Sequence, residues 1–113
     1  MYIRSCLPLT MKIAGIDWDD GNWSKCGKHG VGRGEIDHAL RHMTFRIPDP
    51  NASEQRYRTA SRAPDGRPIF IVYTHRERDG DIWLRPISAR YMHGKEVKEY
   101  EQIEKAMADA GKR

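Results

Sequence analysis

Residues 56–74 read RYRTASRAPDGRPIFIVYT, and this stretch decides the expected architecture. Residues 56–63 follow a period of two, and a continuous apolar run occupies 69–73. A period of two predicts a strand, and Pro64-Asp65-Gly66 between the two segments predicts a turn. The stretch therefore predicts a β-hairpin whose second strand, apolar at every position, lies in the centre of a sheet.

A third strand is expected after the hairpin. Residues 76–80 predict a second turn, and 81–88 read DIWLRPIS, which is typical of a strand in a meander. Pro86 lacks the N–H that a sheet ladder needs. This strand is therefore expected at an edge, or bulged near Pro86, or ending there.

Helices are predicted on both sides of the meander. Trp18-Asp19-Asp20 offers a carboxylate N-cap for a short helix that runs to Lys28-His29 and stops at Gly30. The two further helices each carry one apolar stripe at helical spacing. The stripes are Ile36, Ala39, Leu40 and Met43 in the second helix, and Val97, Tyr100, Ile103 and Met107 in a tail helix that follows Gly94.

The predicted fold class is α+β. We expect an antiparallel sheet of about four strands, with two N-terminal helices and one C-terminal helix packed on one face and the other face free. A short element at 45–47 is expected to end at Pro48. Met11 begins a segment typical of a start codon followed by a strand, so residues 1–10 are interpreted as a mis-start or loose tail, and 11–113 as a single domain.

Composition limits the class of protein. The chain has 113 residues, of which 38% are hydrophobic, so it is expected to form one small globular domain. No apolar stretch reaches the roughly 20 residues that cross a bilayer, and the first ten residues are too short and too interrupted for a secretion signal. Cys6 and Cys26 are expected to be reduced thiols. We therefore expect a cytoplasmic protein that does not bind a membrane.

The positive charge is concentrated in one part of the chain. The formal net charge is +4, and residues 56–90 hold eight arginines, four acidic residues and no lysine. Guanidinium groups bind phosphate oxygens in a fork and stack on bases. Because Arg56, Arg58 and Arg62 share one side of their strand, they predict a stripe on an open sheet face that binds a polyanion. The alternative is ordinary surface charge in an arginine-rich sequence.

Several short motifs lie in a particular order along the chain. They are Trp18-Asp19 with Asn22, Lys28-His29-Gly30-Val31, Glu35, Glu54-x-Arg56, Asp65-Gly66-Arg67, Ile87-Ser88-Ala89-Arg90 and Lys95-Glu96-x-x-x-Tyr100. Together they resemble the BrnT-type ribonuclease toxins of bacterial toxin–antitoxin pairs, from about Ile13 to Tyr100. The resemblance implies a RelE-like fold, RNA cleavage without a metal or other cofactor, and a BrnA-like antitoxin partner that also binds DNA. A homodimer or a hetero-oligomer with the antitoxin is left open.

Cleavage of RNA by its own 2′-hydroxyl needs a base, an acid and cations near the phosphate. The predicted catalytic residues are His29, Glu54, Arg56, Arg85 and Arg90. The three arginines coincide with family motif positions, whereas His29 is a candidate because imidazole is a common proton-transfer group in catalysis. The predicted RNA-binding residues are Lys28, Arg58, Arg62, Tyr73 and Tyr91. Either tyrosine would donate a proton or stack on a base.

Each of these roles has a structural alternative. His29 next to Gly30 would close a helix end. Glu54 would act as a base, orient Arg56, or form a structural ion pair with it across the sheet. Arg90 would pair with Glu54 or Glu96.

Alternative functions are also open. His38 and His42, four residues apart, are two ligands without an obvious third, so no metal site is predicted. Ser88 is expected to be a strand-end hydroxyl. The rivals to a nuclease are a non-catalytic module of the same fold that binds RNA or only the antitoxin, and a plain protein-interaction domain.

Overall fold

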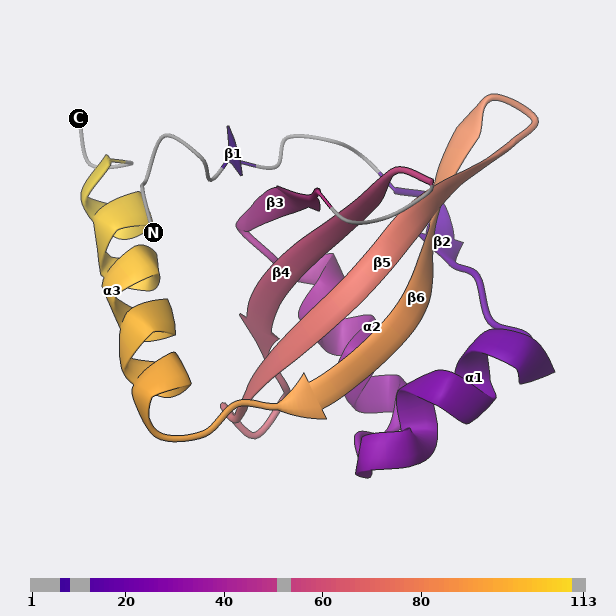
Figure 1. The fold of residues 1–113 in the computed structure, drawn as a ribbon. Helices are drawn as coiled ribbons and strands as arrows, with labels where there is room; N and C mark the ends of the chain where they lie inside the picture. Colours follow the sequence, from indigo (N-terminus) through magenta and orange to yellow (C-terminus); the bar gives the residue numbers. More distant parts are fainter. Residues whose placement is uncertain (1–6, 9–12, 51–53, 111–113) are drawn as a thin grey trace.

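The computed structural model describes residues 7–8, 13–50 and 54–110. Its sheet has six strands in the order β1-β3-β4-β5-β6-β2 (Figure 1). The strands are β1 (Leu7–Pro8), β2 (Gly15–Ile16), β3 (Phe45–Asp49), β4 (Arg56–Arg62), β5 (Pro68–Arg78) and β6 (Asp81–Tyr91). The helices are α1 (Asp20–Cys26), the short 3-10 helix η2 (Gly27–His29), α2 (Arg33–Arg41) and α3 (Lys95–Ala110). Most of the suggested mis-start at 1–10, and Met11 itself, lie outside the described residues.

The predicted hairpin is confirmed. β4 and β5 pair antiparallel from Arg56 opposite Thr74 to Arg62 opposite Pro68, and β5 lies between β4 and β6. The predicted turn at 76–80 is too long, because β5 continues through Arg78. Asp79 and Gly80 both have positive φ, as the two central residues of a tight hairpin turn require.

Two short strands change the predicted sheet. β2 pairs in parallel with β6 at Trp83 and Leu84, so the sheet is mixed and not antiparallel throughout. β3 does not end at Pro48, because Pro48 pairs with Tyr57 inside the strand. The β1 pairing covers only Phe45 and Arg46, so Pro48 occupies a part of β3 that has β4 on one side. An edge position of this kind tolerates the missing N–H.

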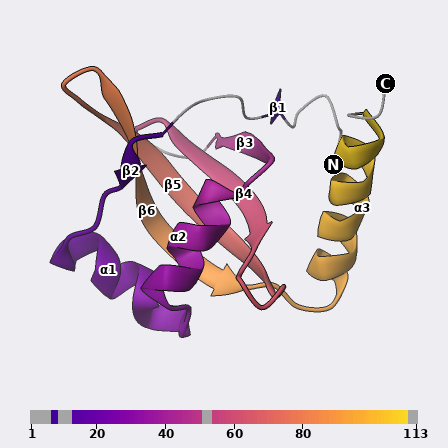
Figure 2. The same ribbon diagram turned by 180° about the vertical axis from the view of Figure 1, so that it is seen from behind.

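α2 covers one face of the sheet, and α1 lies against β6. The apolar stripe of α2 is buried as predicted, and it packs against alternate residues of β5. The buried side chains of this layer include Ile36, Leu40, Ile69, Ile71 and Tyr73. Seen from behind, α2 crosses β4 and β5 on this side (Figure 2). Full burial of one such aliphatic side chain contributes about 1.5–3 kcal/mol, so this layer is the main core.

α3 packs against the opposite face, which we call the open face. Phe45, Ala60 and Tyr100 form a separate small core there, and α3 stands apart from α1 and α2 beside the sheet (Figure 1). The prediction that all helices share one face and leave the other free is therefore wrong. The cause is the exit of β6, which ends at Tyr91 and turns at Gly94, where φ is 52°.

Candidate nucleic-acid interface

A hollow lies on the open face where β4, β5 and β6 pass α1. Its volume is about 330 Å³, and its lining residues are Gly21, Asn22, Lys25, Glu54, Arg56, Arg76, Arg85 and Ile87. Four of the described lining side chains are cations and one is a carboxylate. They come from α1, β4, β5, β6 and the segment before β4. Cations gathered from several elements around one concavity are typical of phosphate binding.

A β-bulge in β6 shapes this end of the sheet. Val72 pairs with Ser88, but the next residue, Tyr73, pairs with Pro86, so Ile87 has no direct partner. Of the three predicted alternatives for Pro86, the bulge is correct, and Pro86 also lies beyond the two residues of β6 that pair with β2. The strand does not end there, since β6 continues to Tyr91 and Pro86 is fully buried. A bulge adds one residue to one strand, so the side chains on its two sides alternate out of step. A residue on one side of the bulge therefore lies on the opposite face from the one it would occupy in a regular strand.

This reversal places Arg85 in the hollow. Arg85 lies opposite Thr74, which lies opposite Arg56, so both guanidinium groups project from the open face across one intervening strand. If the register at Ser88 continued unchanged, Arg85 would lie opposite His75 and share its face. The two arginines converge because of one extra residue in β6.

Arg85 is held by the cap of α1. Its Nη1 donates to Asp19 Oδ2 over 2.8 Å and its Nη2 to Asp19 Oδ1 over 3.2 Å. The hydrogen bond from Arg85 and the backbone N–H of Asn22 lower the pKa of Asp19 to about 2. The same contact raises the pKa of Arg85. Arg85 is a fixed cation whose guanidinium is pre-oriented.

Asn22 connects α1 to the bulge. Its side chain is buried and closes a reciprocal capping box with Asp19: Asn22 N–H donates to Asp19 over 3.0 Å, and Asp19 N–H donates back over 2.8 Å. Asn22 Nδ2 also donates to the carbonyls of Asp17 and Pro86, over 2.9 and 3.0 Å. The motif Trp18-Asp19 with Asn22 thus positions the strand segment that carries Arg85.

Glu54 lies between the two other arginines of the hollow. Its oxygens are 3.6 Å from Arg56 Nε and 3.7 Å from Arg76 Nη1, which is too long for strong hydrogen bonds. Arg56 Nε is buried and has no hydrogen-bond partner among the described residues. The loose contacts of Glu54 leave the positive charge of Arg56 and Arg76 only partly compensated, which favours binding of an anion such as a phosphate.

Residues 18–96 match the family described as the ribonuclease toxin BrnT of type II toxin–antitoxin systems. The chain belongs to the BrnT family. The match includes every residue that lines the hollow, and it ends at the second residue of α3. No curated protein matches the chain. No helix in the described ranges is long and apolar enough to span a bilayer.

The structure brings together three of the residues predicted from the BrnT resemblance: Glu54, Arg56 and Arg85. Arg58 follows Arg56 on the open face just outside the hollow, and its buried Nε also has no hydrogen-bond partner in the described ranges. The remaining arginines of the prediction, Arg62 and Arg90, lie farther along this face. Each is paired with a glutamate of α3, and for Arg90 the partner is Glu96, one of the two predicted.

The other predicted residues lie away from the hollow. Tyr73 is fully buried on the α2 side of the sheet, where burial raises its pKa to about 12. Tyr91 lies on that side too, donating its hydroxyl to Glu35, and the pKa of Tyr91 is raised first by this hydrogen bond. Lys28 and His29 are exposed in η2 and do not line the hollow. Gly30 follows with φ of 85°, so the helix ends where predicted.

Lys25 and Arg76 line the hollow but were not among the predicted site residues. Each had a signal in the sequence. Arg76 continues the period of two of β5 from Thr74, so a longer strand would have placed it beside Arg56. Lys25 follows Asn22 by three residues, the spacing of neighbours on one helix face.

No group of three or more potential metal ligands gathers within the described ranges. His38 and His42 stack with ring centroids 4.1 Å apart. The Nδ1 of His38 lies 3.2 Å from the carbonyl of Arg62, and the Nδ1 of His42 lies 2.8 Å from the carbonyl of His38. Both rings therefore have local structural partners.

Proposed function

We propose that this protein is an endoribonuclease toxin that binds a phosphate of single-stranded RNA in the hollow and cleaves the chain beside it. The observation that carries the proposal is the convergence of Lys25, Arg56, Arg76 and Arg85 around one concavity with Glu54. Membership of the BrnT family supports the reaction class. The four cations supply the positive charge that the phosphorane-like transition state needs, so the mechanism requires no metal ion.

In this mechanism the Glu54 carboxylate accepts the proton of the 2′-hydroxyl, and the 2′-oxygen attacks the adjacent phosphorus. A new 2′-O–P bond forms while the bond from phosphorus to the 5′-oxygen breaks. We assign the Lys25 ammonium to donate a proton to the leaving 5′-oxygen. The products are a 2′,3′-cyclic phosphate and a 5′-hydroxyl. Arg56 and Arg85 bind the non-bridging oxygens, because both project from the same face.

His29 and Arg90 have no role in this mechanism, because neither lines the hollow. The proposed partner is a protein antitoxin, as the type II class implies, and its identity as a BrnA-like protein is part of the proposal. A RelE-like relationship of the fold remains a prediction.

The test is cleavage of an end-labelled single-stranded RNA by purified protein in excess EDTA, with an all-2′-deoxy version of the same sequence as the uncleavable control. Arg56→Ala and Arg85→Ala should each lower the rate by about 100- to 1,000-fold. Glu54→Gln should lower the rate with little loss of binding. Arg41→Ala is the matched control, since Arg41 pairs with Asp37 on the exposed side of α2 and does not line the hollow. Equal rates for Arg56→Ala and Arg41→Ala would refute the site.

A second candidate function is RNA binding without cleavage. It is favoured by the two hydrogen bonds that Arg85 donates to Asp19. Because these bonds already use two N–H groups of the guanidinium, fewer remain to stabilise a transition state. Binding of the labelled RNA with a steep salt dependence, but without any cyclic-phosphate product, would identify this function.

A further inference from the structure

The contact between α3 and the open face is rich in charge and poor in apolar area. Its buried apolar core consists of Phe45, Ala60 and Tyr100. The partly buried residues around this core are Ile47, Met92, Ile103 and Met107. By comparison, the core under α1 and α2 contains twelve buried residues. The burial of apolar side chains therefore contributes less to the docking of α3 than to the docking of α1 and α2.

Two bidentate ion pairs hold α3 in place. Arg62 donates to Glu104 over 3.0 Å from Nε and 2.7 Å from Nη2, and Arg90 donates to Glu96 over 2.7 Å from each Nη. All four side chains are about one third or more exposed. Ion pairs of exposed side chains contribute little to stability. Their fork geometry is also the geometry in which arginine binds a phosphate.

The paired arginines lie at one end of the stripe that leads to the hollow. Arg56, Arg58 and Arg62 occupy one face of β4, and neighbouring positions of this kind are about 7 Å apart. Arg90 lies opposite Phe70 on the same face, with its guanidinium 4.8 Å from the Phe70 ring. Cations beside an aromatic ring are suited to bind an extended single strand, because its phosphates can pair with the cations and its bases can stack on the ring.

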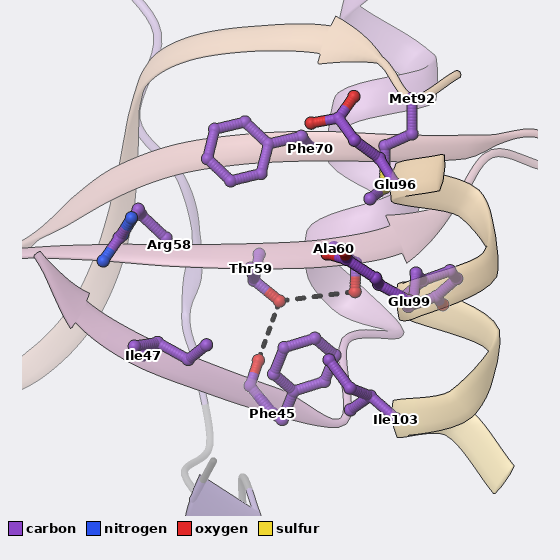
Figure 3. A pocket seen from close by; sticks show the side chains of 11 residues that line it. Phe45, Ile47, Arg58, Thr59, Ala60, Phe70, Met92, Glu96, Glu99 and Ile103 are labelled. Carbon is purple, nitrogen blue, oxygen red and sulfur yellow. Dashed lines mark hydrogen bonds between the residues drawn. The ribbon is translucent and has the colours of Figure 1, made fainter. Parts of the chain in front are cut away.

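A groove separates α3 from this face (Figure 3). Its volume is about 140 Å³; Phe45, Phe70 and Met92 line it, while Glu96 and Glu99 face them from α3. Arg58 lines the groove at the side away from the helix (Figure 3). The groove thus continues the arginine stripe from the hollow to the place where α3 covers it.

We propose that α3 is a displaceable cover over an extended RNA-binding track, and that the carboxylates of Glu96 and Glu104 occupy positions that RNA phosphates take when single-stranded RNA binds. The inference rests on the proposed function, because the RNA is first held in the hollow. When RNA extends along β4, its phosphates replace the carboxylates of Glu104 and Glu96 as partners of Arg62 and Arg90. One of its bases then lies against Phe70. The helix then leaves the open face, and the closed form lowers the apparent affinity for longer RNA.

The experiment compares two double variants that remove the same charge. Glu96→Gln with Glu104→Gln breaks both ion pairs, whereas Glu77→Gln with Asp109→Asn removes two charges that make no ion pair in the described ranges and line neither the groove nor the hollow. Binding is measured with a 2′-O-methyl oligonucleotide of about 10 nucleotides and with a dinucleotide. Circular dichroism reports whether α3 remains helical in each variant.

The first variant should bind the longer RNA up to about tenfold more tightly than the control variant, with equal dinucleotide binding. For each variant the salt slope should be steeper for the longer RNA than for the dinucleotide by at least about 1.4, since Arg62 and Arg90 each neutralise one further phosphate at about 0.7. Hydrogen exchange in α3 of the wild type should accelerate when the longer RNA binds. Equal affinities of the two variants for the longer RNA would overturn the proposal, as would exchange in α3 that is unchanged by RNA and accelerated only by a protein partner.

The outcome is separable from that for the hollow. Arg56→Ala tests the proposed function directly. If Arg56→Ala weakens binding of both RNA lengths while the two double variants behave alike, the hollow is the RNA site and α3 is not its cover. If Arg56→Ala leaves the binding of both lengths unchanged, the proposed function fails first.

Discussion

Asn22→Ala should destabilise the protein strongly, although the residue is polar and lies in a seven-residue helix. Its side chain makes three hydrogen bonds, to the backbone of Asp17, Asp19 and Pro86. Each such bond contributes about 1 kcal/mol, and loss of Asn22 leaves the buried carbonyl of Pro86 without this donor. We therefore expect the free energy of unfolding to fall by about 3 kcal/mol, out of a typical 5–15 kcal/mol.

The measurement is urea unfolding followed by tryptophan fluorescence. With a urea slope of about 1–3 kcal/mol/M, the midpoint should fall by at least about 1 M at an unchanged slope. Ser24→Ala on the same helix is the control, since its exposed hydroxyl bonds only the carbonyl of Gly21; its effect should stay within about 0.5 kcal/mol. A midpoint for Asn22→Ala equal to that of Ser24→Ala would show that the link between α1 and the bulge does not stabilise the fold.

Three further changes test other parts of the structure. Tyr73→Phe removes a buried hydroxyl that makes no hydrogen bond of good geometry in the described ranges and has the Arg46 guanidinium as a polar neighbour. Thermal unfolding should therefore show equal stability or a gain of up to about 1 kcal/mol, and a clear loss contradicts this. Asp19→Ser keeps an N-cap oxygen but releases Arg85. We expect a free energy of unfolding within about 1 kcal/mol of wild type, together with tighter RNA binding and slower cleavage. Unchanged binding and cleavage would argue against a role of Asp19 in positioning Arg85. Burial, and then the neighbouring Arg46, lower the pKa of His75 from 6.5. As the pH falls, His75 is therefore protonated in the unfolded chain before it is protonated in the folded protein. The contribution of neutral His75 to the free energy of unfolding is fully present above pH 6.5 and is lost as the pH falls to the pKa of the folded state. His75→Gln should flatten this fall below about pH 6.5, and an identical urea-midpoint profile in the variant would contradict it.

The prediction of the fold succeeded where the signal is local. The period of two in 56–63, the Pro-Asp-Gly turn and the apolar stripes of α2 and α3 each depend on neighbours within one element, and all were correct. The two-residue strand β2 was predicted as a strand, but its parallel pairing with Trp83 and Leu84 was not. Nothing in so short a segment specifies the direction of its partner.

The prediction of the site was limited in the same way, because local sequence patterns do not show which distant segments come into contact. Glu54, Arg56 and Arg85 were placed in one site from the family resemblance, and the structure brings them together. His29 was included because imidazole suits proton transfer, but residue type carries no information about distance. Lys25 was left out although its spacing places it on one helix face with Asn22, because the sequence does not show that this face lies beside β6.

The sequence alone determined that arginines occupy one side of β4, because side chains alternate strictly along a strand. Only the tertiary structure decided which of them are available. The bulge beside Pro86 brings Arg85 to the same face as Arg56, and the docking of α3 engages Arg62 and Arg90 with glutamates. Both outcomes depend on pairing between segments far apart in the chain, and the free energy of such pairing is not encoded in the local pattern of either segment.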